Sequence, residues 1–262
     1  MILLSFDIEE FDMPYEYGKI IDFKDQIGIS KIGTAIILDL LRKNNIKATF
    51  FSTVVFAQNA PELIEQIKSE GHEIASHTYY HSKFETADLK KSKEALELQT
   101  GLKVNGFRMP RMQPVDELEI YKAGYTYNSS INPTYLPGRY NNLHISRTYY
   151  FDNKVLQIPA SVTPLFRFPL FWLSFHNLNL KLYQLLARWT FKKDGYLNIY
   201  FHPWEFTDLD KKEVYHFPKY VSKNSGNNMT KRVNDFIVHM KNKKYEFGTI
   251  GEFIAKKNLL NG

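Results

Sequence analysis

The segment "ILLSFDIEEFD", residues 2–12, joins a run of apolar residues to a cluster of carboxylates. Its first part lacks the polar–apolar alternation of a half-exposed strand, which is typical of a parallel strand buried on both faces. The acidic residues follow directly at the C-terminal end of that run. The segment therefore predicts a buried parallel strand that carries carboxylates into a site at one end of a sheet.

The strand-then-helix pattern repeats through residue 131. Apolar spacing with Pro or Gly at the boundaries predicts helices over residues 29–45, 60–71, 87–101 and 114–125. Short β-forming runs predict strands over residues 47–54, 72–77, 104–110 and 126–131. This alternation favours an α/β fold with a parallel sheet or barrel.

The second half of the chain is less regular. Residues 132–160 are rich in Tyr, Asn and Pro, with one further strand expected over 155–161, and we expect insertions over about 132–191 to shape the substrate site. Residues 194–206 form another strand followed by polar residues, and the tail from 227 to 260 predicts a basic helix, a short strand and a final helix. A length of 262 residues suits a single barrel-sized domain, so we expect one domain over 1–262.

Composition excludes several classes of function. There is no cysteine, which leaves His, Asp and Glu as the metal ligands and excludes disulfides and thiol nucleophiles. The net charge is +6, but the lysines are scattered and no nucleic-acid motif accompanies them, so no nucleic-acid partner is expected. The first residues lack a basic region and an apolar stretch of export length, so we expect a cytoplasmic protein.

Two histidines stand four residues apart in "SHTYYH", at positions 77 and 81. Random placement of the 8 histidines would give about 0.2 such pairs. Four residues make one helical turn, which would place both rings on one face and let them share a metal with a third ligand. A pair of this kind without nearby carboxylates is more simply explained as two surface or core histidines.

The opening acidic run supplies the carboxylates. Asp7 and Glu9 are two positions apart, so an extended chain points both to the same side. One could bind a metal while the other acts as general base on the metal-bound water. A solvated loop fits Glu10 and Asp12 better than it fits Asp7, which directly follows the apolar strand.

Two further strand ends complete a set of groups for hydrolysis. In "GFRMPRM", Arg108 follows an apolar run and could hold the base ionised and oriented. In "YFHPWEF", His202 follows a β-forming run, where it could protonate a leaving amine. Each signal is weak alone, but together they form the arrangement that a metal hydrolase requires.

The order and spacing of these motifs resemble the polysaccharide deacetylase family, carbohydrate esterase family 4, with its NodB homology domain. "SFDIEE" is similar to a branch in which an extra residue separates base and ligand, and "HTYYH" matches the His-Ser/Thr-x-x-His motif. The resemblance implies that Asp7 is the catalytic base and that Glu9, His77 and His81 bind the metal. It also implies a distorted (β/α) barrel of about seven parallel strands.

The later motifs of the family match as well, and the resemblance spans residues 4 to about 206. "RMP" matches Arg-x-Pro, which implies that Arg108 tunes the base and that the backbone N–H of Arg111 stabilises the oxyanion. "YFHPWEF" implies that His202 is the general acid. We place Arg111, Asn128 and Trp204 as substrate contacts in the same site.

Two positions depart from the family pattern. Asn128 stands where the family usually has an Asp that pairs with the catalytic histidine, so the pKa of His202 should be lower unless another carboxylate such as Glu205 substitutes. Glu9 is one methylene longer than the usual Asp ligand, which bears on metal affinity.

The implied function is a metal-dependent N-deacetylase that removes acetyl from an N-acetylated sugar of a glycan or glycan precursor. One divalent ion is expected, with zinc as the default for two imidazoles and a carboxylate. Two alternatives stay open: an amidohydrolase acting on a small non-sugar amide, and a catalytically silent glycan-binding protein of the same fold.

An aromatic stretch over residues 164–191 is too polar for a membrane span. Helices that pack in the core are the favoured interpretation. The alternative is that Phe166, Phe171, Trp172 and Phe175 contact the inner face of a membrane, where a lipid-linked acetamido sugar is one candidate substrate and a nucleotide-linked sugar is another. The sequence does not indicate an oligomeric state.

Overall fold

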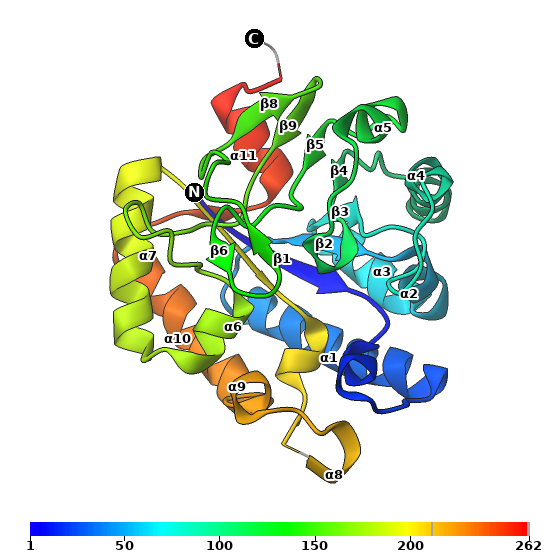
Figure 1. The fold of residues 1–262 in the computed structure, drawn as a ribbon, viewed down its shortest axis with the longest axis horizontal. Coiled ribbons are helices and arrows are strands. Elements are labelled where there is room, and N and C mark those ends of the chain that lie inside the picture. Colours follow the sequence, from blue (N-terminus) through cyan, green and yellow to red (C-terminus); the bar gives the residue numbers. More distant parts are fainter. Residues whose placement is uncertain (211, 261–262) are drawn as a thin grey trace.

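The computed structural model describes residues 1–210 and 212–260, which form one curled main sheet with helices packed around its outside (Figure 1). The main sheet has the strand order β10-β1-β2-β3-β4-β5-β9-β8, and β11 also pairs with β1. Pairing in this sheet is parallel from β10 to β9, and the β8–β9 pair is antiparallel. In chain order the strands of this sheet are β1 (Ile2–Ile8), β2 (Thr49–Ser52), β3 (Glu73–Ser76), β4 (Gly106–Phe107), β5 (Tyr127–Asn128), β8 (Tyr150–Asp152), β9 (Val155–Gln157), β10 (Leu197–Phe201) and β11 (Phe247–Gly248).

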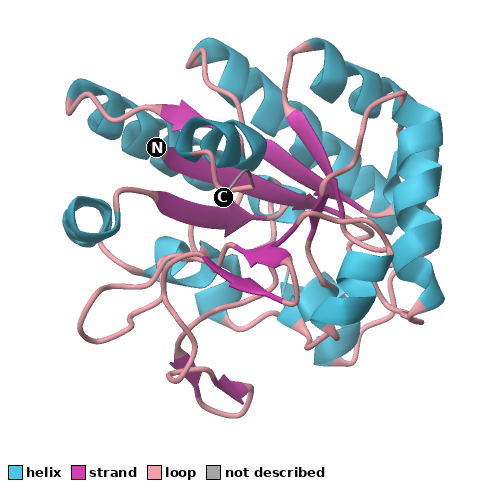
Figure 2. Ribbon diagram, turned by 90° about the horizontal axis from the view of Figure 1, so that it is seen from above, coloured by secondary structure: helices cyan, strands magenta, loops and turns pink. Residues whose placement is uncertain are grey.

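Helices cover the outer side of this sheet, and a small hairpin stands apart from it (Figure 2). The hairpin is formed by β6 (Tyr135–Leu136) and β7 (Tyr140–Asn141). The α-helices are α1 (Phe23–Lys43), α2 (Val54–Asn59), α3 (Pro61–Ser69), α4 (Ala87–Thr100), α5 (Glu117–Lys122), α6 (Trp172–Asn177), α7 (Leu180–Asp194), α8 (Lys212–Tyr215), α9 (Lys219–Ser222), α10 (Asn227–Asn242) and α11 (Ile250–Lys257). Three 3₁₀ helices are η1 (Met13–Tyr17), η2 (Pro110–Met112) and η3 (Pro203–Phe206).

The curled sheet is a mostly parallel half-barrel, and this confirms the predicted fold class. The path from β10 to β9 contains seven mutually parallel strands, as expected. Asn198 of β10 links this strand to the segment that follows β9. The backbone C=O of Asn198 accepts from the N–H of Ser161, and its side chain donates to the carbonyls of Ile158 and Pro159. Because all seven residues of β1 are buried, this strand forms the centre of the core.

Helix α1 packs directly on η3, the segment that follows β10. Gly33 makes this contact possible, since a Cβ at this position would lie 1.9 Å from the backbone oxygen of Pro203. The absence of a side chain therefore lets α1 support the segment that begins after His202.

The sequence missed some boundaries. Helix α1 begins at Phe23, earlier than expected, because apolar periodicity alone does not mark its first turns. The strands predicted over 104–110 and 126–131 shorten to the two-residue strands β4 and β5. Their flanking residues instead form loops that carry functional side chains.

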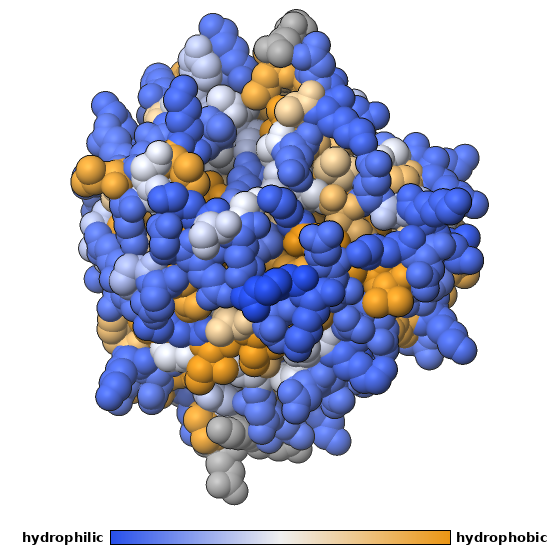
Figure 3. Space-filling view, turned by 180° about the vertical axis from the view of Figure 1, so that it is seen from behind, coloured by the Kyte–Doolittle hydropathy of each residue, from blue (hydrophilic) through white to orange (hydrophobic). Residues whose placement is uncertain are grey.

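The aromatic stretch contributes mainly to packing, as the favoured interpretation expected. Phe171 and Phe175 are buried and Trp172 is half-buried, whereas Phe166 is 83% exposed. Among the residues that the structure describes, no helix combines the length and the apolarity that a membrane crossing requires. The face in Figure 3 is mainly hydrophilic, with apolar patches separated by polar side chains.

Candidate active site

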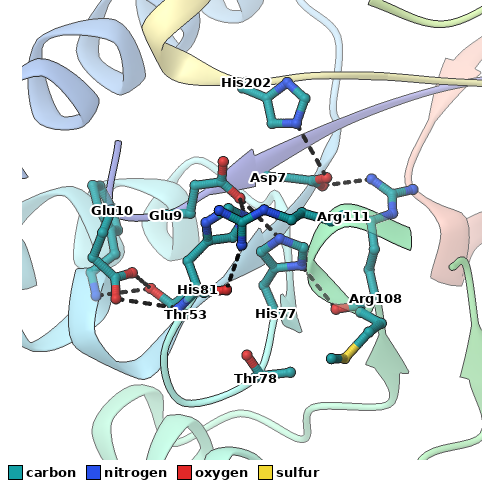
Figure 4. Close-up of polar contacts among 12 residues, drawn as sticks. Asp7, Glu9, Glu10, Thr53, His77, Thr78, His81, Arg108, Arg111 and His202 are labelled. Atoms are coloured by element: carbon teal, nitrogen blue, oxygen red, sulfur yellow. Dashed lines mark hydrogen bonds and ion pairs between the residues drawn. The ribbon is translucent and has the colours of Figure 1, made fainter. Parts of the chain in front are cut away.

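The carboxyl ends of β1, β3, β4 and β10 surround a cavity of about 280 Å³. This placement follows from the parallel sheet, because parallel strands bring the residues after them to one common end. Figure 4 shows the polar groups converging there. The predicted site residues that line the cavity are Asp7, Glu9, His77, His81, Arg111, His202 and Trp204.

Glu9, His77 and His81 form a compact group of three ligand atoms. The Nε2 atoms of His77 and His81 each lie 3.0 Å from the same Glu9 oxygen, Oε2. One ligand atom from each residue lies within 4.8 Å of the other two, and all three side chains are buried. Glu9 reaches this position directly after β1, so its extra methylene does not prevent it from joining the two imidazoles.

The histidine pair is not on a helix, contrary to the helical-turn prediction. Residues 77–81 form a loop after β3, and the two rings stack with centroids 5.7 Å apart. Thr78 adopts a left-handed backbone with φ 68°, and its hydroxyl donates to the carbonyl of Tyr80 over 2.7 Å. This sharp turn lets both rings face the cavity, so loop geometry replaces helical spacing.

Each imidazole is oriented by a second hydrogen bond behind it. Nδ1–H of His77 donates to the carbonyl of Arg108 over 2.8 Å, and Nδ1–H of His81 donates to Asp12 over 2.8 Å. With Nδ1 protonated, a neutral ring has its lone pair on Nε2, which faces the Glu9 oxygen. Lone pairs that face a carboxylate at 3.0 Å repel unless a proton or a metal cation lies between them.

The donor set therefore fits a bound divalent metal. Tetrahedral zinc with N and O bonds of about 2.0–2.1 Å separates its ligand atoms by about 3.3 Å, close to the spacing of this group. The hydrogen bonds to Arg108 and Asp12 are the outer contacts that orient metal-bound histidines.

The charges of these groups are coupled. Burial alone would raise the pKa of Glu9, but His81, the hydrogen bond from His77 and the charge of His202 together lower it to about 2. Burial alone would lower the pKa of His81, but Glu9 and Asp12 raise it above the ordinary value. The site is therefore built to keep the Glu9 carboxylate ionised.

Asp7 lies beside the metal-ligand group and is held by Arg108. The guanidinium Nη1 lies 2.6 Å from Asp7 Oδ1, and both side chains are buried. Arg108 also donates to Ser5 and to the backbone and side chain of Ser129, which satisfies a fully buried cation. The other Asp7 oxygen, Oδ2, is 3.9 Å from Nε2 of His202, a separation longer than a hydrogen bond.

His202 is paired with Glu205, whereas the family pattern would pair it with an Asp at the position of Asn128. Its Nδ1–H donates to Glu205 Oε1 over 2.9 Å. Burial alone would lower the pKa of His202, but the hydrogen bond to Glu205 and the charges of Glu9, Glu205 and Asp7 raise it to about 9. Glu205 thus substitutes for the missing Asp, and the alternative of a lowered pKa is wrong.

Asn128 lies behind the cavity wall instead of facing substrate. Its amide donates to Gln157 over 2.9 Å, and its oxygen accepts from Ser130. Ser130 in turn accepts from the backbone N–H of Met109, so Asn128 ties β5 to the segment after β4. This geometry gives no support to the predicted substrate contact.

The two other predicted substrate contacts lie at the cavity but have further partners. Trp204 stacks on His202, with ring centroids 4.7 Å apart, and its N–H lies 3.5 Å from Glu9 Oε1. The Arg111 side chain donates to Asp12 and Glu16, while its backbone has a left-handed φ of 54°. The oxyanion role of its backbone N–H stays a prediction.

Two residues assigned to a solvated loop are buried, and that prediction is wrong. Glu10 is 6% exposed and accepts from Thr53, and Asp12 is 3% exposed and bridges His81 to Arg111. Burial raises the pKa of Glu10. Partners from distant segments cover both carboxylates, so the neighbouring sequence did not indicate that they are buried.

Segments from the irregular second half complete the cavity wall. Leu136, Pro137, Arg139 and Tyr140 come from the β6–β7 hairpin, and Phe171, Trp172 and Leu173 come from the start of α6. Arg139 donates to Glu16 of η1 over 3.2 Å, which joins the hairpin to the opposite wall. The region predicted to shape the substrate site therefore does line the cavity.

Comparisons with known proteins agree with this geometry. The sequence model of the polysaccharide deacetylase family matches residues 23–127, which include His77, His81 and Arg108. A peptidoglycan-N-acetylglucosamine deacetylase of Bacillus cereus is 46% identical over 48 residues, 18% of this chain and 18% of that protein. Matched segments span at most 25% of the length of the curated relatives.

Solved structures share the fold over nearly the whole chain. A probable polysaccharide deacetylase of Pseudomonas aeruginosa aligns with a TM-score of 0.66 at 14% identity, covering 97% of this chain and 89% of that one. A pseudoenzyme of carbohydrate esterase family 4 from Bacillus anthracis aligns with a TM-score of 0.53 at 14% identity, covering 96% and 64%. The ordered motifs, the family match over residues 23–127 and the common fold all agree with a resemblance of this chain to the polysaccharide deacetylase family.

Proposed function

We propose that the protein is a metal-dependent N-deacetylase acting on an N-acetylated sugar of a glycan or glycan precursor. The observation that carries the proposal is the convergence of three sets of groups on one cavity. These are the Glu9–His77–His81 group, the Arg108-bound Asp7 and the Glu205-bound His202.

Glu9, His77 and His81 would hold one divalent ion, and zinc suits two imidazoles and a carboxylate. When bound, such an ion supplies a water of lowered pKa and polarises the amide carbonyl. The outer hydrogen bonds of His77 and His81 keep their Nε2 atoms available for it.

The chain's own residues supply the proton transfers. Asp7, fixed by Arg108 at 2.6 Å, is positioned to take a proton from the attacking water. His202 lies on the same cavity with Nε2 3.9 Å from Asp7, so an acetamide group beside both residues would present its nitrogen to a proton donor. The backbone N–H of Arg111 is the proposed partner of the developing oxyanion.

The walls of the cavity support a sugar substrate. Aromatic rings of Tyr140, Trp172, Tyr200 and Trp204 line it, as does the amide of Asn132. Aromatic rings can pack on the apolar faces of a sugar, and an amide can bind its hydroxyl groups. Small-molecule sites commonly combine apolar walls with a few polar groups in this way. Lipid-linked and nucleotide-linked acetamido sugars are two candidate substrates.

Two other functions remain to be separated from this one. A hydrolase of a small non-sugar amide would use the same polar groups, and the Arg139–Glu16 bridge across the cavity favours a compact substrate. A silent glycan-binding protein would not need a filled metal site. The complete set of polar groups favours an enzyme over a silent binder.

The deciding experiment measures hydrolysis of a panel of substrates with and without a chelator, read as acetate release from the acetylated sugars and as ring opening of the cyclic amides. The panel holds sugar nucleotides, lipid-linked sugars, acetylated oligosaccharides and small cyclic amides. We expect release from an acetamido sugar that stops on chelation and returns with zinc. Ring opening of the cyclic amides alone would assign the alternative hydrolase, and a metal-free protein that binds glycans without turnover would assign the silent binder.

A further inference from the structure

His176 of α6 is a buried histidine that the predicted motifs do not include. Its Nε2 lies 2.8 Å from Oε2 of Glu205, and both side chains are fully buried. The other Glu205 oxygen, Oε1, accepts from Nδ1–H and from the backbone N–H of His202. Glu205 is therefore held between two imidazoles, one facing the cavity and one behind it.

The hydrogen bonds define where the protons are. Nδ1 of His176 contacts the backbone carbonyl of Lys223, which can only accept, so this nitrogen carries a proton. Nε2 faces a carboxylate, and His176 and His202 keep the pKa of Glu205 below its usual range despite burial. Both ring nitrogens of His176 therefore face acceptors, a geometry that fits a ring donating at both nitrogens and balancing the charge of Glu205.

The ring of Trp172 fixes this arrangement from the side. It meets His176 edge-on at 5.8 Å and His202 edge-on at 5.6 Å between centroids. Packing as well as hydrogen bonds therefore holds both histidines in orientation. Because Glu205 is hydrogen-bonded to both rings, a change at His176 affects His202 through Glu205.

We infer that His176 is a positioning residue for the deacetylation proposed above: it holds Glu205 against His202 and neutralises the Glu205 charge, so that His202 can release its proton to the leaving amine. An isolated buried carboxylate would bind the His202 proton more tightly and make it a weaker acid. With His176 present, Glu205 keeps its orienting hydrogen bond without its full negative charge. The inference rests on the proposed function for its catalytic meaning.

Several other groups face His202 and contribute to its pKa. Asp7 and Glu9 approach from the end of β1, Glu205 comes from η3, and the remaining contacts are the uncharged rings of Tyr200, Trp172 and Trp204. Of these groups, Trp172 also contacts His176, but its ring is uncharged. A change in the titration of His202 can then be assigned to the charge balance at Glu205.

The test compares zinc-loaded wild type with His176→Gln, which keeps an amide donor near Glu205 but carries no charge. NMR titration of the histidine rings, with His202 assigned from the spectrum of His202→Gln, should show the pKa of His202 rising by about one unit. His72→Gln is the matched control, because His72 is a buried histidine packed on Phe50 in another part of the sheet. An unchanged or lowered pKa of His202 in His176→Gln overturns the inference.

Two further readouts complete the test. In wild type, which needs no variant to fold, ¹⁵N shifts should show both ring nitrogens of His176 protonated at pH 7, and an unprotonated Nε2 overturns the inference. In His176→Gln, kcat should fall about tenfold with KM within about twofold, because proton donation is weakened and binding is not. If wild type releases no acetate from any substrate, the proposed function fails while the NMR titration still decides the role of His176.

Discussion

Arg108, at the end of β4, reaches Asp7 of β1 across the cavity end of the sheet, and the guanidinium and carboxylate lie 2.6 Å apart. The guanidinium donates to the side chains of Asp7, Ser5 and Ser129 and to the backbone carbonyl of Ser129, and it lies 4.0 Å from the ring centroid of Phe51. Such a cation is fixed in one orientation, so it fixes the carboxylate as well. The proposed catalytic base is thus positioned by a residue 101 positions away in the chain.

Arg108→Lys keeps the positive charge but loses the planar fork that binds Asp7 and Ser129 together. We expect kcat to fall about 100-fold, because the base loses its orientation, while the free energy of unfolding drops by about 2–3 kcal/mol from unpaired buried groups. Steady-state kinetics and urea unfolding measure the two effects. A variant with wild-type kcat would show that Arg108 serves stability alone.

Asp7→Asn and His77→Ala separate the base from the metal ligands. Asp7 lies outside the three-ligand group, so Asp7→Asn should retain one equivalent of zinc while losing turnover. His77→Ala removes one of three ligands and should lose both. Elemental analysis of the purified proteins together with acetate release checks this, and zinc retained at full occupancy in His77→Ala would contradict the assigned ligand set.

Asp12→Asn tests the hydrogen bond behind His81. The carboxylate accepts from Nδ1–H of His81 over 2.8 Å, and loss of its charge should weaken zinc binding about 10–100-fold. Glu16→Gln is the matched control, because Glu16 also binds Arg111 but is not hydrogen-bonded to either histidine ligand. Competition with a fluorescent chelator measures the affinities, and equal losses in the two variants would assign the effect to Arg111.

The local sequence predicted which strand ends carry chemistry, because a buried apolar run followed by polar residues fixes both direction and place in a parallel sheet. Asp7, Glu9 and His202 reached the cavity for this reason. It could not predict the burial of Asp12, since the residues that cover and bind it, such as Arg111, come from other segments. Asn128 shows the converse: motif position suggested a contact, but packing against Gln157 turned the side chain away.

The pH profile should report the pairing of His202 with Glu205. His202 must be protonated to donate a proton, so kcat/KM should fall as pH rises through its pKa, which the hydrogen bond and nearby carboxylates raise to about 9. Glu205→Gln removes that hydrogen-bonded charge and should move the falling limb to lower pH, toward the ordinary histidine value of about 6.5. A limb that does not move would show that another residue donates the proton.

Gly33→Ala tests whether α1 supports the catalytic segment. The added Cβ would lie 1.9 Å from the Pro203 backbone oxygen, so either α1 or η3 must move. We expect a loss of about 1–3 kcal/mol in the free energy of unfolding and a clear fall in kcat, because Pro203 directly follows His202. Gly28→Ala is the control on the same helix, since its Cβ would meet nothing within 4 Å and should add up to about 1 kcal/mol of helix stability. If both variants keep wild-type stability and turnover, the close packing of α1 on η3 does not position the proton donor.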